Sequence, residues 1–172
     1  PEGYDTDRDR RWPLLLFLHG AGERGHDLET VRRHGPMKHG SHPEQRPFVI
    51  VCPQCPPDAI WSPVLVDELV EKICAEQRID RSRLYVTGIS MGGWGVWDLI
   101  GRYPDKYAAA LPMASGALPS LAGRIKHIPI RTFSGELDDF VPNDPAHDIV
   151  TAIRALGGSA ELLIIPGKSH QA

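Results

Sequence analysis

Short apolar runs alternate along the chain with segments in which apolar residues recur every three or four positions. The runs are at most seven residues long, and Gly, Pro or Asp bounds most of them. Most are apolar at successive positions, as is typical of strands covered on both faces of a parallel sheet. This alternation predicts an α/β domain with a mainly parallel sheet and helices on both faces. We expect strands at Pro13–Leu18, Phe48–Cys52, Arg83–Thr87, Tyr107–Met113, Pro129–Phe133 and Glu161–Ile165.

In three of the intervening segments, the spacing of apolar residues predicts a helix. Ser62 followed by Pro63 supplies an N-cap and a first-turn proline for the first helix, and apolar residues then recur at helical spacing. The second helix ends before Tyr103-Pro104, because a proline disfavours helix in the residue before it, and the third ends at Gly157. Each predicted helix connects two predicted strands, as crossover connections require. The helices are expected at residues 63–78, 91–102 and 143–156.

Length and composition fit one folded domain. The chain has 172 residues, of which 41% are hydrophobic, and this is enough for a substantial apolar core. We therefore expect residues 1–172 to form a single domain. The cysteines number three, an odd count that does not indicate a disulfide-stapled scaffold.

The charge balance argues against nucleic acid as a partner. The chain has 19 Lys and Arg against 22 Asp and Glu, so no basic excess is present to hold a phosphate backbone. The longest apolar runs, such as Leu14–Leu18, fall far short of the roughly 20 residues that a membrane span needs, and no charged-then-apolar leader precedes them. We expect a soluble protein. The sequence leaves open its oligomeric state and whether it is cytoplasmic or exported.

Cys52-Pro-Gln-Cys55 has the spacing of a redox or zinc motif. A redox CxxC normally opens a helix, whereas Pro56 and Pro57 follow this one, and no second CxxC completes a four-thiolate site. We therefore expect buried or loop thiols here. His26, His34, His39 and His42 share a polar stretch rich in Gly and Pro, but no HExxH or comparable spacing supports a metal site, so we expect a solvated loop and no metal.

The sequence Gly88-Ile89-Ser90-Met91-Gly92 lies where a predicted strand gives way to a predicted helix. A sharp turn at such a junction lifts a serine hydroxyl out of the sheet edge, and the flanking glycines allow the crowded backbone. The bare G-x-S-x-G pattern is common by chance, but the strand-to-helix context is typical of a nucleophile elbow. We expect Ser90 to be a nucleophile. A solvated serine in a glycine-rich turn is the alternative.

A serine is a weak nucleophile at neutral pH and needs a histidine base, which a carboxylate orients. In the chain order typical of this elbow, the acid follows the serine and the histidine comes last. Of the histidines after Ser90, His127 precedes any acid at the end of strand 129–133, and His147 lies inside a predicted helix. His170 follows the last predicted strand in a short loop, so we expect it to be the base. The candidates for the acid are Glu136, Asp138 and Asp139.

The oxyanion of a tetrahedral intermediate also needs hydrogen-bond donors. We expect one to be the backbone N–H of Met91, the residue after the nucleophile, and the other to be that of Ala21, in the loop after the first strand. His19 in the same loop is expected to hydrogen-bond within the loop rather than to act in catalysis. Trp61 and Trp94 are candidates for a substrate pocket, with plain core packing as the alternative.

Taken together, these motifs resemble those of α/β-hydrolases. Within that superfamily they resemble the esterases of the phospholipase/carboxylesterase and polyhydroxybutyrate-depolymerase-like groups. The similarity covers nearly the whole chain. It rests on Pro1–Asp5 (P-x-G-Y-D), Phe17–Gly25 (F-L-H-G-A-G-E-R-G), Pro53–Pro56 with Trp61 (P-Q-C-P…W), Gly88–Trp97 (G-x-S-M-G-G-x-G-x-W) and Gly135–Pro142 (G-x-x-D-x-x-V-P).

The resemblance implies an α/β-hydrolase fold and selects Asp138 as the acid, because the family's acid stands three residues after the glycine of its acid loop. Ser134-Gly135 replaces the His-Gly that usually opens that loop. Family members also carry strands ahead of the P-x-G-Y-D segment and a helix after the catalytic histidine. The chain is therefore expected to lack the first strands and the last helix of the fold.

The function implied is that of a serine carboxylesterase that acts through an acyl-enzyme. Ser90 attacks the ester carbonyl, His170 is the base, and Asp138 orients the imidazole. No cofactor is expected, and the partner is a small-molecule or polymeric carboxylic ester. One alternative is a serine peptidase of prolyl-oligopeptidase type, which an amino-terminal recognition domain would distinguish. The other is a non-catalytic hydrolase-fold binding module, which would have no need for all three intact residues.

Overall fold

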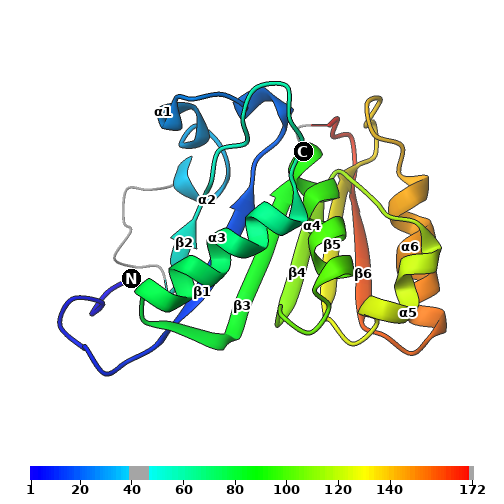
Figure 1. Ribbon diagram of the computed structural model, residues 1–172. Coiled ribbons are helices and arrows are strands. Elements are labelled where there is room, and N and C mark those ends of the chain that lie inside the picture. The colour runs from blue at the N-terminus through cyan, green and yellow to red at the C-terminus, as the bar shows by residue number, and fades with distance from the viewer. Residues whose placement is uncertain (39–46, 171–172) are drawn as a thin grey trace.

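A computed structural model of the chain describes residues 1–38 and 47–170 (Figure 1). Its strands form one parallel sheet in the order β2-β1-β3-β4-β5-β6. Each predicted strand is present, and the prediction of an α/β fold with a mainly parallel sheet is confirmed. β3, which ends next to Ser90, lies between β1 and β4 near the middle of the sheet. The strands are β1 (Trp12–Leu18), β2 (Val49–Val51), β3 (Ile79–Ile89), β4 (Ala109–Met113), β5 (Ile130–Gly135) and β6 (Ala160–Ile165).

The three predicted helices are also present, as α3 (Pro63–Glu76), α4 (Met91–Arg102) and α6 (Asp144–Ala155). Ser62 caps α3, because its hydroxyl accepts a hydrogen bond from the N–H of Leu65 (3.4 Å). Within the described residues, no helix is both long and apolar enough to cross a membrane. Shorter elements complete the chain: α1 (Leu28–Val31), α2 (Gly35–Lys38), α5 (Ala122–Ile125) and the 3-10 turns η1 (Ala21–Glu23) and η3 (Pro119–Leu121).

Part of the polar stretch expected to be a solvated loop is helical, so that prediction needs correction. α1 and α2 lie within the stretch. Asp27 starts α1, because its carboxylate accepts a hydrogen bond from the N–H of Glu29 (3.0 Å) and so caps the helix. His39 and His42 lie outside the described residues. Among the residues that are described, no three His, Cys, Asp or Glu side chains gather as a metal site would need.

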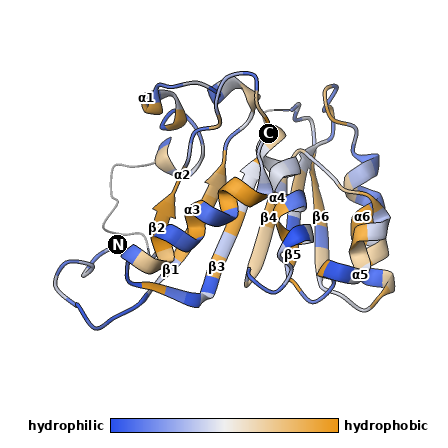
Figure 2. Ribbon diagram, in the orientation of Figure 1, coloured by the Kyte–Doolittle hydropathy of each residue, from blue (hydrophilic) through white to orange (hydrophobic). Residues whose placement is uncertain are grey.

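The main core lies between the sheet and the helices α3, α4, α5 and α6. Leu14, Leu16 and Leu18 alternate along β1 with residues of the opposite face, and each is 0% exposed within this core. α4 is deeply embedded, with eight of its 12 residues buried. Figure 2 shows hydrophobic residues on the strands and along α3 and α4. This packing holds the start of α4, and with it Ser90, against the end of β1.

The opposite face of the sheet is covered only in part. α2 lies against Phe17, since a Cβ on Gly35 would stand 2.4 Å from the Phe17 ring, and Phe17 is 2% exposed. Beyond this contact, Leu15, Tyr85 and Leu111 help to line an open hollow of about 550 Å³. Helices thus lie on both faces, as predicted, but in the described part of the chain they cover the two faces unequally.

Candidate active site

Ser90 lies between the last residue of β3 and the first residue of α4, in a backbone conformation that serine seldom adopts. Its φ is +56° and its ψ is −119°, and a left-handed backbone is strained for any residue with a Cβ. Two hydrogen bonds hold the turn. The N–H of Ser90 donates to the carbonyl of Met113 (2.9 Å), and the carbonyl of Ser90 accepts from the N–H of Trp94 (3.0 Å). The sharp strand-to-helix turn expected from the motif is present.

Two glycines make this turn possible. A Cβ on Gly92 would stand 1.9 Å from the carbonyl oxygen of Leu18, and a Cβ on Gly88 would stand 2.5 Å from the carbonyl oxygen of Gly92. No side chain fits at either position, so β1, β3 and α4 meet backbone to backbone. The same approach brings Ser90 beside the loop after β1, because a Cβ on Gly20 would lie 3.8 Å from the Cβ of Ser90.

Two short contacts join Ser90 to a histidine and an aspartate from distant parts of the chain. Nε2 of His170 lies 2.8 Å from Oγ of Ser90, and Nδ1 of His170 lies 2.8 Å from Oδ2 of Asp138. Asp138 follows β5 and His170 follows β6, and the carboxyl ends of parallel strands meet at one edge of a sheet. The structure thus brings together all three residues that the sequence singled out.

Asp138 is fixed by its own loop. Its Oδ1 accepts hydrogen bonds from the N–H groups of Phe140 (3.0 Å) and Val141 (2.9 Å), and its carboxylate is 0% exposed. Burial by itself raises the pKa of this carboxyl, but the N–H of Val141, the His170 side chain and the N–H of Phe140 together hold the pKa below its ordinary value. Asp138 is therefore ionised at neutral pH and accepts a hydrogen bond from the Nδ1–H of His170.

The other two candidate acids do not face the histidine. Glu136 accepts a hydrogen bond from the N–H of Gly167 (2.8 Å), which ties the acid loop to the loop after β6. Asp139 is exposed. The residues alone left the choice among these three carboxylates open, and the resemblance selected Asp138. The geometry agrees with that selection.

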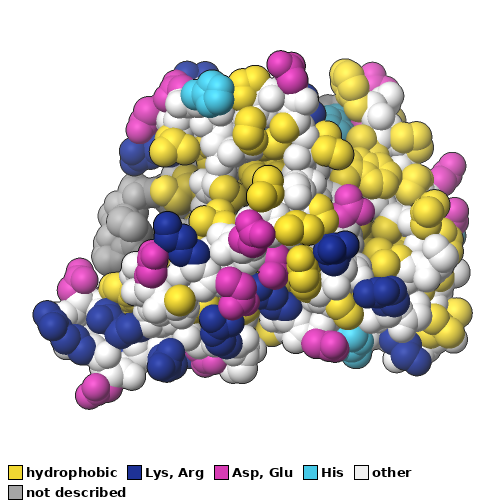
Figure 3. All heavy atoms as spheres, viewed as in Figure 1, with side chains coloured by type: hydrophobic (Ala, Val, Ile, Leu, Met, Phe, Trp, Pro, Cys, Tyr) yellow, Lys and Arg dark blue, Asp and Glu magenta, His cyan; other side chains and the backbone are white. Residues whose placement is uncertain are grey.

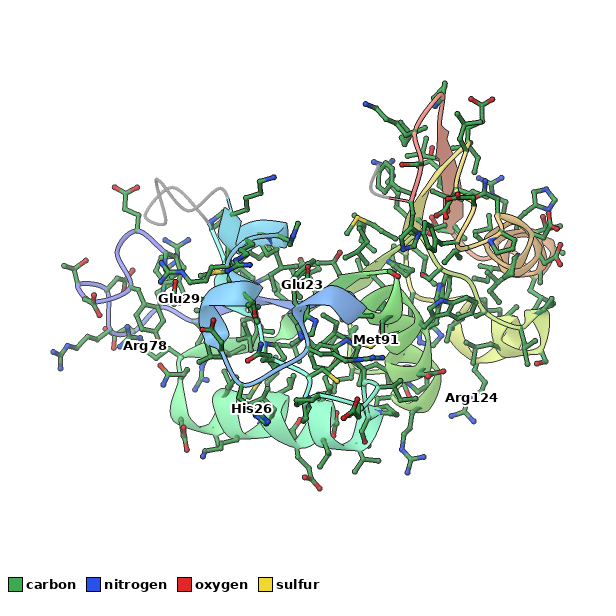
Figure 4. The ribbon with its side chains drawn as sticks, turned by 90° about the horizontal axis from the view of Figure 1, so that it is seen from above. Glu23, His26, Glu29, Arg78, Met91 and Arg124 are labelled. Atoms are coloured by element: carbon green, nitrogen blue, oxygen red, sulfur yellow. The ribbon has the colours of Figure 1, made fainter. Side chains whose placement is uncertain are left out.

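Ala21 and Met91, the predicted backbone donors, each begin a helical segment next to Ser90. Ala21 opens η1 and Met91 opens α4, and the first N–H groups of a helical segment have no acceptor within it. The two segments are also in contact, because the guanidinium of Arg24 lies 3.2 and 2.9 Å from Sδ of Met91. Figure 4, seen from above, shows Glu23 of η1 close to Met91 at this edge.

His19 anchors the loop that carries Ala21. Its ring is buried, its Nε2 accepts a hydrogen bond from the N–H of Cys55 (2.9 Å), and its Nδ1 donates to the carbonyl of Gly20 (2.6 Å). Burial lowers the pKa of His19, because the charged imidazolium would lose its water. The ring is therefore neutral, as one donor and one acceptor nitrogen require. The indole N–H of Trp61 donates to the carbonyl of His19 (3.0 Å) and completes the anchor.

The sequence profile of the dienelactone hydrolase family matches residues 60–171, which is more than half of the chain and includes the Ser90 turn and the His170 loop. The chain belongs to this family. The resemblance to α/β-hydrolases and their esterases, inferred from the motifs, is confirmed.

The proteins that this chain resembles include esterases. A thermostable esterase of known structure is 35% identical, with a TM-score of 0.87, over 94% of this chain and 48% of that one. Poly(3-hydroxyalkanoate) depolymerase C of Paucimonas lemoignei is 39% identical over 51 residues, which are 30% of this chain and 12% of the depolymerase. A phospholipase/carboxylesterase of Dyadobacter fermentans DSM 18053 has the same fold, at 23% identity and a TM-score of 0.65, over 94% of this chain and 84% of that one. The chain thus spans about half of the thermostable esterase and a small part of the depolymerase.

A hollow of about 320 Å³ lies along the first turns of α4 in this family member. Trp61, which is 7% exposed, packs against the helix at Gly95, where a Cβ would stand 2.8 Å from the Cβ of Trp61. Trp94 is 40% exposed and lines the same hollow. Both predicted pocket residues therefore border one concave surface that begins next to Ser90.

Two neighbours of the site were not found in the sequence. The Phe140 ring lies 5.5 Å from the His170 ring, and no sequence pattern marks an aromatic residue two positions after the acid. The side-chain amide of Gln54 donates to the carbonyl of Glu23 (2.9 Å) and to the hydroxyl of Thr30 (3.0 Å), which fixes the loop after β1. Gln54 belongs to the P-Q-C-P segment that supports the resemblance. The segment marks this residue, but its sequence does not indicate that Gln54 fixes the loop after β1.

The Cys52–Cys55 pair was expected to consist of buried or loop thiols: Cys55 is buried, and Cys52 is half-buried just after β2. Cys55 and Cys74 lie in the core, and burial raises the pKa of both thiols. A raised pKa disfavours the thiolate that redox and metal chemistry need. The contribution of Cys55 to the site is its backbone N–H, which holds His19.

Proposed function

We propose that this protein is a serine hydrolase that cleaves carboxylic esters, with Ser90, His170 and Asp138 as its catalytic triad. The observation that carries the proposal is the continuous chain of hydrogen bonds from Oγ of Ser90 through His170 to the buried carboxylate of Asp138, at 2.8 Å for each link. This is the arrangement in which a histidine removes the proton of a serine hydroxyl. Its position at the carboxyl edge of a parallel sheet agrees with the similarity of this chain to a thermostable esterase.

The reaction proceeds through an acyl-enzyme. Oγ of Ser90 forms a bond to the ester carbonyl carbon while its proton passes to Nε2 of His170, and the N–H groups of Ala21 and Met91 bind the oxygen that becomes negative. The bond to the alcohol then breaks, and His170 returns the proton to the leaving oxygen. Water repeats the sequence on the acyl-enzyme and releases the acid. These steps use protein groups and water, and they call for no metal or organic cofactor.

Asp138 supports this sequence in two ways. Its hydrogen bond keeps the proton of neutral His170 on Nδ1, so that Nε2 is free to accept the serine proton. Its negative charge also stabilises the imidazolium that forms during attack. A carboxylate with a lowered pKa stays charged throughout, which is what both roles need.

The surroundings of Ser90 fit esters with apolar groups next to the reacting carbonyl, either small molecules or exposed segments of a polymer. Two apolar side chains near the site are largely exposed: Ile60 (73%), which lines the hollow, and Phe140 (77%), whose ring lies against His170. In Figure 3, hydrophobic side chains gather in the upper middle of the face, whereas Lys and Arg lie mostly in its lower half. The similarity to a poly(3-hydroxyalkanoate) depolymerase supports a polymeric ester as one substrate. We propose that residues 1–172 act as one catalytic domain in this reaction.

A fluorophosphonate probe and p-nitrophenyl esters of increasing acyl length test the proposal. The wild-type protein is expected to be labelled and to release p-nitrophenol, and Ser90→Ala is expected to lose both. Ser115→Ala is the matched control, because Ser115 is buried against α4 at Gly93 but lies outside the triad. Labelling that survives in Ser90→Ala, or cleavage of peptide anilides without cleavage of esters, would contradict the proposal.

A further inference from the structure

The hollow beside Ser90 has one charged side chain in its wall. The residues that line it are Ile60, Trp61, Met91, Trp94, Gly95 and Asp98. The Asp98 carboxylate is exposed to solvent at one end of the hollow. The protein around it raises its pKa, because the charged form is partly desolvated there. A partly desolvated carboxylate at the end of an apolar wall is stabilised by a positively charged partner.

The aromatic residues of the hollow favour the same kind of partner. Trp94 stands four residues before Asp98 on α4, so the two side chains lie on the same side of the helix. Trp61 is buried and its indole N–H is bonded to the carbonyl of His19. Trp94, which is 40% exposed, is therefore the ring in this hollow that a cation can cover. A cation over a tryptophan ring is attracted by the ring's quadrupole. A neutral hydroxyl gains only a hydrogen bond from Asp98, and an anionic group is repelled.

The position of Asp98 sets the distance from the reacting ester. Asp98 lies seven residues after Met91 on α4, which is about 10 Å along a helix. An extended chain advances about 3.6 Å for every three bonds. Six bonds and an ion-pair contact of about 4 Å therefore span this length. The guanidinium of Arg24, in contact with Sδ of Met91, disfavours a cation at the Ser90 end. A positive charge is therefore favoured only at the far end.

We propose that Asp98 and Trp94 bind the cationic amine end of an ester substrate, with the positive charge about six bonds from the reacting carbonyl carbon. This inference rests on the proposed function, because it takes Ser90 as the residue that attacks the ester. No bond forms or breaks at Asp98. Its carboxylate selects the substrate by charge, and Trp94 covers the alkyl groups around that charge.

A pair of isosteric esters tests this selection. One is a p-nitrophenyl hexanoate with a trimethylammonium group at the end of its chain, and the other carries a tert-butyl group in the same place. Rates are measured per active site titrated with the fluorophosphonate probe. We expect the wild-type kcat/KM to favour the cationic ester by about tenfold, the effect of a partly desolvated ionic and cation–π contact. In Asp98→Asn the ratio is expected to fall to about one, and Asp98→Glu is expected to keep the preference.

A remote carboxylate provides the control. The side chain of Asp105 is 93% exposed in the loop after α4. Asp105→Asn is expected to keep the wild-type ratio of kcat/KM between the two esters. A second substrate pair, with the cation at the same distance on the alcohol side of an acetate ester, tells which part of the substrate enters the hollow. A wild-type ratio near one in both pairs, or an unchanged ratio in Asp98→Asn, overturns the assignment. Failure of the proposed function looks different, because the protein would then neither react with the probe nor cleave either ester.

Discussion

The α-carbon of Gly92 faces the carbonyl oxygen of Leu18 where α4 meets β1, and a Cβ on Gly92 would stand 1.9 Å from that oxygen. Since the atoms that the new Cβ would meet belong to the backbone of Leu18 and His19, Gly92→Ala must push α4 and β1 apart. We expect a loss of roughly 2–4 kcal/mol in the free energy of unfolding and a large fall in ester turnover, because Ser90 and the loop that carries Ala21 separate. Chemical denaturation and p-nitrophenyl ester kinetics measure the two effects.

Gly123 in α5 is the control for this substitution. No atom lies within 4 Å of a Cβ placed there, so Gly123→Ala is expected to be neutral or to stabilise the protein by up to about 1 kcal/mol, since alanine restricts the unfolded chain. A Gly92→Ala protein as stable and as active as Gly123→Ala would show that α4 does not approach β1 this closely.

The second prediction separates Asp138 from its neighbour Asp139. Asp138→Asn keeps the side-chain shape but removes the charge that stabilises the His170 imidazolium and the acceptor that sets its tautomer. We expect kcat to fall by roughly 10³- to 10⁴-fold. Asp139→Asn removes an exposed charge and is expected to stay within about twofold of the wild type. The same steady-state assay measures both variants. A larger fall in kcat for Asp139→Asn than for Asp138→Asn would show that Asp139, and not Asp138, is the acid.

The third prediction concerns Phe140, whose ring packs on His170 from the exposed side. The ring restricts the tilt of the imidazole and keeps water from part of it, so Phe140→Ala is expected to lower kcat by roughly two- to tenfold. Stability is expected to change little, because the ring is 77% exposed. Leu137→Ala, at a neighbouring residue that is 62% exposed, is the control and is expected to retain wild-type kcat. Equal rates in the two variants would remove any role for the ring contact.

Much of the scaffold follows from the sequence because its signals are local. Successive apolar positions mark the strands, Ser62-Pro63 marks the start of α3, and the glycines around Ser90 mark a turn at a strand end. Parallel strands then place the ends of β3, β5 and β6 on one edge, which is enough to predict that Ser90 and His170 meet. The choice of Asp138 over Asp139 needed the resemblance, because periodicity does not tell which of two adjacent carboxylates turns inward.

The supporting contacts are harder to predict because they join residues that are far apart in the sequence. The N–H of Cys55 reaches Nε2 of His19 across 36 residues, through two loops without a repeating pattern. The packing of α2 on Phe17 depends likewise on a close approach at Gly35 that appears only once both elements are in place. Such contacts depend on the full fold rather than on any segment's own preference.

The last prediction uses the buried His19 to test how the oxyanion loop is held. Its pKa is lowered from 6.5 in the folded protein, chiefly by burial, so below about pH 6.5 the unfolded chain binds a proton that the folded protein does not. Stability therefore rises with pH in this range. The contribution of neutral His19 is fully present above 6.5 and is lost as the pH falls toward the lowered value. In His19→Gln, which does not titrate, we expect the free energy of unfolding to depend less steeply on pH between about pH 7.5 and about pH 5, by up to about 1.4 kcal/mol per pH unit.

The variant is also expected to lose ester turnover at neutral pH, because the loop carrying Ala21 loses its bond to Cys55. An unchanged pH slope together with normal turnover would mean that neither the burial of His19 nor its bond to Cys55 governs this loop.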